Sequence, residues 1–160
     1  MKRLIMVLAI LVLILVLLPA GSAQAKKPLD GSTSYTFMGL SGILDGEGRP
    51  LIWEGPITGE IAGTIRWYAA SEMHYTGQAS HYDVVWEIVD AGDNVILAGE
   101  DSGSTTARHG KNSNWRTNGI VTVASDPYSE WLGRHVHMGG NFTWVMPGLP
   151  EQGTGYFFVG

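Results

Sequence analysis

The chain has 160 residues, with 10 lysines and arginines against 15 aspartates and glutamates, and it contains no cysteine. This acidic balance, with the basic residues scattered, argues against binding to nucleic acid or to an anionic membrane surface. The absence of cysteine excludes disulfides and a lipid-modified cysteine anchor, so stability has to come from burial of a core.

The first 25 residues have the three-part pattern of a secretory signal peptide. Lys2 and Arg3 precede 15 apolar residues, Leu4 to Leu18, and Ala23-Gln24-Ala25 is a small-x-small cleavage site. The apolar run is short for a membrane-spanning helix, which needs roughly 20 residues. We therefore predict a signal-peptide helix over residues 1–25, and an uncleaved segment that anchors the protein outside the membrane is the alternative.

Residues 26–160 are of a suitable length for one domain, which we expect to be secreted. Removing residues 1–25 takes away Lys2 and Arg3 and no acidic residue, so 8 basic residues remain against 15 acidic ones, a net charge of −7.

Apolar residues in this domain alternate with polar ones, which is typical of half-buried strands. The clearest case is 59–69, where Ile65 and Trp67 fall on one face and Arg66 and Tyr68 on the other. In chain order we predict strands over 35–40, 51–53, 59–69, 81–89, 95–103, 115–125, 135–146 and 156–159, and a tight turn at 90–94.

Eight short strands joined by short connections predict an all-β fold, either a sandwich or a single antiparallel barrel of about eight strands. Glycines inside the strands favour the barrel, because closure needs sharp bends where glycine fits. The interior of such a barrel is either filled by side chains or wide enough for one small ligand.

Residues 104–114 have no apolar pattern, and we expect an exposed loop there, at the rim of any binding site.

His135 and His137 lie two apart in a predicted strand and therefore point to the same side. Such a pair can begin a metal site, but the glutamate that follows the pair in cupins is absent, and we predict no metal. If Val136 and Met138 face the core, the histidines face water. If the faces are reversed, the histidines line a polar cavity together with Glu100 or Asp101.

Glu100 and Asp101 are neighbours in a strand, so only one of them can point into the barrel. An inward carboxylate is more often bonded to an arginine or a tryptophan N–H than used in catalysis, and Arg66 and Arg116 are the candidate arginine partners.

The sequence contains six tryptophans, and most of them fall on apolar strand faces. Core packing is the first explanation for them, and an aromatic-lined ligand site is the alternative.

A resemblance to a class of known β-barrel proteins rests on five segments: WEIV (86–89), LAGEDSG (97–103), HGKNSNWR (109–116), GEIAGTIRW (59–67) and GTGYFF (153–158). With them, the chain resembles exported prokaryotic proteins of the allene-oxide-cyclase-like or dirigent-like barrel type. These families cyclise fatty-acid epoxides or steer phenolic radical coupling in apolar cavities without a cofactor. The resemblance thus implies an eight-stranded antiparallel barrel with an apolar-ligand cavity, and it transfers no catalytic residue.

Three functions remain open at this point. The one we favour from sequence is an exported barrel that binds a small apolar or aromatic ligand and needs no cofactor. The alternatives are a cofactor-free cyclase or isomerase, and a filled barrel that acts through its surface, including by homo-oligomerisation. The candidate ligand-binding residues are Trp67, Trp86, Glu100, Arg116, His135 and His137.

Overall fold

The computed structural model describes residues 27–160 except 40, 73, 76–78, 107–111 and 147–148. The predicted signal peptide lies outside these residues. The elements are β1 (Leu29–Phe37), β2 (Leu51–Gly59), β3 (Gly63–Ala69), β4 (His74–Tyr75), β5 (Ala79–Val89), β6 (Val95–Thr106), β7 (Asn112–Ala124), the 3-10 helix η1 (Ser129–Trp131), β8 (His135–Met146) and β9 (Leu149–Val159).

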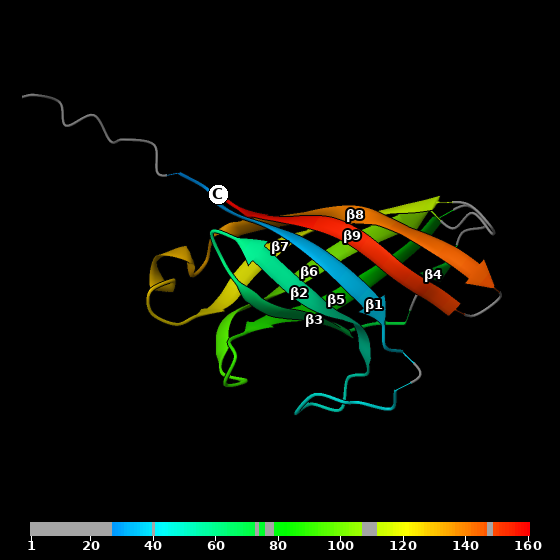
Figure 1. Cartoon of the computed structure of the whole chain (residues 1–160), viewed down its shortest axis with the longest axis horizontal. Coiled ribbons are helices and arrows are strands. Elements are labelled where there is room, and N and C mark those ends of the chain that lie inside the picture. The colour runs from blue at the N-terminus through cyan, green and yellow to red at the C-terminus, as the bar shows by residue number, and fades with distance from the viewer. Residues whose placement is uncertain (1–26, 40, 73, 76–78, 107–111, 147–148) are drawn as a thin grey trace, which may run out of the picture.

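Eight of the strands form a closed antiparallel barrel. They follow the order β3-β2-β1-β9-β8-β7-β6-β5, and β3 pairs with β5 to close the sheet, while the two-residue β4 adds to β5. The first and last strands are neighbours, with Leu29 opposite Val159, so the chain ends beside the start of β1 (Figure 1). The prediction of an all-β antiparallel barrel is confirmed.

Several strand boundaries differ from the prediction. The strand predicted over 59–69 begins at Gly63, because Gly59 is the last residue of β2 and residues 60–62 connect the two strands. β1 begins at Leu29 rather than residue 35, because glycine and threonine occupy inward positions before Tyr35. β2 runs through Pro56, although proline has no N–H to donate. The β1–β2 pairing is interrupted there, between the pairs Thr33–Ile57 and Thr36–Glu54. β6 reaches Thr106 and β7 begins at Asn112, so the predicted 104–114 loop is wrong at both of its ends.

The inward side chains form one hydrophobic core that includes residues of all eight barrel strands. Its members at the end of the barrel near η1 are aliphatic, with Trp131 of η1 packed among them. Towards the other end the core is aromatic, and its rings meet edge to face: Tyr35 contacts Trp53, Trp67 and Trp115 at centroid distances of 5.1, 5.6 and 5.8 Å.

The rings in this aromatic part need a wall without side chains. A Cβ atom on Gly153 of β9 would overlap the ring of Tyr35, and one on Gly155 would lie 3.1 Å from Cζ2 of Trp115. Glycine is therefore required at these positions by the close approach of backbone and ring.

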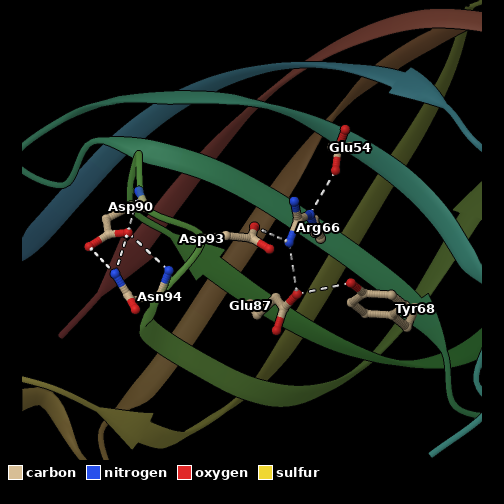
Figure 2. Close-up of polar contacts among 8 residues, drawn as sticks. Glu54, Arg66, Tyr68, Glu87, Asp90, Asp93 and Asn94 are labelled. Atoms are coloured by element: carbon tan, nitrogen blue, oxygen red, sulfur yellow. Dashed lines mark hydrogen bonds and ion pairs between the residues drawn. The ribbon is translucent and has the colours of Figure 1, made fainter. Parts of the chain in front are cut away.

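On the outer face, Arg66 of β3 joins the two strands that flank it (Figure 2). Its Nε donates to Glu54 of β2 at 2.7 Å, and its Nη1 lies 3.5 Å from Glu87 of β5 and 2.8 Å from Asp93 in the β5–β6 turn. Burial alone would lower the pKa of Arg66, but its hydrogen bonds and charge interactions with Glu54 and Asp93 raise that pKa above its usual value. This network lies on the β3–β5 pairing that closes the barrel.

The β5–β6 turn is built as predicted. The carboxylate of Asp90 accepts the backbone N–H groups of Gly92 and Asn94 at 2.8 and 2.9 Å, and Asp93 adopts a φ of 63° (Figure 2).

We predict that Arg66→Met lowers the free energy of unfolding by about 1–2 kcal/mol, because it removes a partly buried charge network. Urea denaturation measures the loss, which should shrink in high salt as exposed charges are screened. Arg134→Met is the control, since Arg134 is exposed and forms no ion pair with another described residue. Equal stability of the two variants would contradict a role in closing the barrel.

We also predict that Gly153→Ala destabilises the protein by about 1–3 kcal/mol, because the added methyl group displaces the Tyr35 ring. Gly46→Ala is the matched control, since a Cβ there meets nothing within 4 Å and should change stability by less than about 0.5 kcal/mol. The measurement is the melting temperature together with urea denaturation. A loss no greater than that of the control would show that the ring does not depend on this glycine.

Candidate functional site

The six candidate residues from sequence divide between the two faces of the barrel wall. Trp67 and Trp86 point inward and are 4% and 0% exposed. The other four candidates, Glu100, Arg116, His135 and His137, are all exposed on the outer face. The inner pair and the outer four therefore do not form one site.

The orientation of β8 decides between the two predictions for its histidines. Val136 and Met138 are buried in the core, so His135 and His137 face outward. His137 shares a 2.6 Å hydrogen bond with Asn118 and packs against Phe158 at a centroid distance of 6.3 Å. Among the described residues, no three side chains of the metal-ligating types come together as a site.

Asp101, and not Glu100, is the carboxylate that points into the barrel. Its Oδ1 accepts Nε1–H of Trp86 at 2.8 Å, and its Oδ2 accepts the hydroxyl of Thr117 at 2.6 Å. Burial raises the pKa of Asp101, and the two hydrogen bonds offset part of that rise. Because both oxygens are bonded, this carboxylate ties β5, β6 and β7 together as a structural acceptor.

A second buried polar chain links β1 to the wall formed by β8 and β9. Trp115 donates its indole N–H to the hydroxyl of Tyr35, and that hydroxyl lies 3.0 Å from the carbonyl oxygen of Asn141 and 3.4 Å from that of Thr154. The indole N–H of Trp67 is buried and has no hydrogen-bond partner in the described structure, although the ring contacts Tyr35 and Trp115 edge to face.

A groove of about 680 Å³ crosses the outer face of β2, β1, β9, β8 and β7. In Figure 1, β1, β9 and β8 run side by side along the upper part of the barrel. Nine exposed residues line the groove: Ser32, Ser34, Pro56, Thr58, Asn114, Arg116, Asn141, Thr154 and Tyr156. Four inward or half-buried residues of the described wall also line it: Thr33, Trp115, Gly140 and Gly155.

The floor of the groove is one layer of backbone. Gly155 lines the groove, and its inner side lies against Trp115 and Tyr35. The hollow on the outside and the aromatic packing on the inside therefore share the same glycine wall.

Sequence reasoning found Arg116 but missed most of the groove. Its residues are short polar side chains at the outward positions of neighbouring strands, where alternation alone predicts only contact with water. The residue types could have indicated the groove. Serine, threonine and asparagine occupy outward positions at which the longer side chains of lysine and glutamate are common.

Comparison with known proteins found no match: no family model, curated protein or solved structure matches this chain. The resemblance to allene-oxide-cyclase-like and dirigent-like barrels therefore stays a prediction. Among the described residues, no helix has the length and apolar content needed to cross a membrane.

The environment of Asp101 predicts a pH dependence of stability. A raised pKa in the folded state means that folding favours the protonated acid. The contribution of Asp101 to the free energy of unfolding is therefore full at pH values below its usual pKa of 3.8, and it is lost as the pH rises through the pKa of the folded state. The stability of the protein relative to Asp101→Asn should therefore be greatest in acid and fall towards neutral pH. Urea denaturation between pH 4 and 8 measures it.

Asp90→Asn is the control, because the stability contribution of Asp90 should change with pH in the opposite direction. Hydrogen bonds from Asn94, with a smaller contribution from the N–H of Gly92, lower the pKa of Asp90. The contribution of Asp90 to the free energy of unfolding is therefore present at pH values above its usual pKa of 3.8, and it is lost as the pH falls through the pKa of the folded state. Parallel pH profiles for the two variants would contradict the assignment for Asp101.

Proposed function

We propose that the chain is an exported binding module that acts through the groove on its outer face. The observation that carries the proposal is the groove itself, which is of the size of small-molecule sites and is lined by side chains from five strands. Export is supported by the signal-peptide pattern of residues 1–25.

The described interior gives less support to a ligand inside the barrel. Trp86 and Phe157 are almost fully buried and contact each other at 5.3 Å, and Tyr35 contacts Trp67 and Trp115 edge to face towards the other end. A ligand there would have to displace packed rings, at a cost comparable to that of disrupting a core. This favours surface binding over the apolar ligand that the sequence led us to expect.

A cyclase or isomerase also has weaker support. Asp101 is the buried carboxyl group of the described core, and both of its oxygens are engaged by Trp86 and Thr117. An acid or base for catalysis needs an oxygen within reach of the substrate.

A matched pair of substitutions tests the site. Thr154 lies in the groove and Thr122 is exposed on β7 outside its lining, so Thr154→Tyr fills the groove while Thr122→Tyr adds the same side chain elsewhere. We expect ligands found by saturation-transfer NMR in a library of polar metabolites and glycans to lose at least tenfold in affinity with Thr154→Tyr only. Equal binding by both variants, or an absence of any ligand in the library, would overturn the proposal.

A further inference from the structure

The chemistry of the groove narrows the ligand class, and this step rests on the function proposed above. Among the described residues of the lining, Arg116 is the one that carries a charge, and none is an aspartate or glutamate. The guanidinium forms no ion pair with any other residue that the structure describes. An arginine in that position offers its planar set of donors to an anionic ligand, and a carboxylate matches that geometry with two parallel hydrogen bonds.

An exposed aromatic ring lies beside this arginine. Gly139 of β8 pairs with Arg116 on one side and with Tyr156 on the other. Tyr156 is 49% exposed, and its ring lies across Gly139, where a Cβ atom would come within 2.9 Å of the ring. The two side chains rise from strands about 10 Å apart, with no side chain between them, since neighbouring strands are spaced by about 4.8 Å.

The rest of the lining is neutral and able to form hydrogen bonds. Ser32, Ser34 and Thr154 carry hydroxyls, and Asn114 and Asn141 carry amides. Within the described structure, none of these five side chains has a hydrogen bond to another residue through its own polar atoms. Each therefore presents free donors and acceptors to a bound molecule.

We propose that the groove binds an oligosaccharide that carries a carboxylate, such as a chain of uronic acid units. Arg116 pairs with the carboxylate, Tyr156 packs against the apolar face of a sugar ring, and the hydroxyl and amide groups bond the sugar hydroxyls. A purely apolar ligand would leave these polar groups unpaired, and the one guanidinium of the described lining can pair with a single carboxylate of the saccharide.

The test compares trigalacturonic acid with its trimethyl ester, in which a neutral methyl ester replaces each carboxylate on the same sugar chain, by isothermal titration calorimetry on the purified protein. We expect the acid to bind about tenfold more tightly than the ester, as one charge-assisted pair predicts. Arg116→Gln should remove that preference and leave ester binding within about twofold, and Tyr156→Ala should weaken both ligands. Arg134→Gln, at an exposed arginine outside the groove lining, is the control and should change neither.

Two results would overturn the inference while leaving the groove as a binding site: equal affinity for acid and ester, or an acid preference that survives Arg116→Gln. If neither saccharide binds, the inference fails, and the Thr154→Tyr and Thr122→Tyr comparison with other ligands decides the proposed function separately. If both saccharides bind Thr154→Tyr as well as they bind the unchanged protein, both proposals fail.

Discussion

The structure depends on the close approach of two aromatic rings to a glycine wall. Tyr35 and Trp115 lie against Gly153 and Gly155, and the hydroxyl of Tyr35 accepts the indole N–H of Trp115 and reaches the carbonyl oxygen of Asn141. This arrangement packs the rings against the backbone of β9 and satisfies the buried polar groups of both rings. Gly155 also lines the groove on the outer face, so the rings and the groove lie on the two sides of the same backbone.

Polar groups on the two faces of the barrel have different tasks. Inside, Asp101 holds Trp86 and Thr117 in place, and its raised pKa is the consequence of burial. Outside, Arg66 is shared among carboxylates of neighbouring strands and of a turn, at the seam where the sheet closes. In both cases the carboxylates have partners within the protein. Arg116 has no such ion pair in the described structure, so its guanidinium is available to the ligand that we propose.

The sequence was sufficient for the fold class and for the inner parts of the strands with strong alternation, although the strand predicted over 59–69 begins only at Gly63. The strand at 135–146 was predicted with the bounds that the structure has, because Val136, Met138 and Phe142 mark its inward face. β1 and β9 were only partly predicted, since glycine and threonine fill inward positions that the rings of distant strands approach. The groove could not be predicted, because its residues come from five strands and their register depends on barrel closure.

The local charge of the groove is opposite to that of the whole domain, and this affects how an anionic ligand would bind. The net charge of −7 on residues 26–160 repels an anion at long range, but at physiological ionic strength this field decays over about 8 Å. Among the described residues that line the groove, Arg116 is the one charged side chain, and no carboxylate lies beside it in that lining. The attraction is therefore short-ranged and acts after encounter, so a preference for acidic sugars should arise from slower dissociation rather than from faster association.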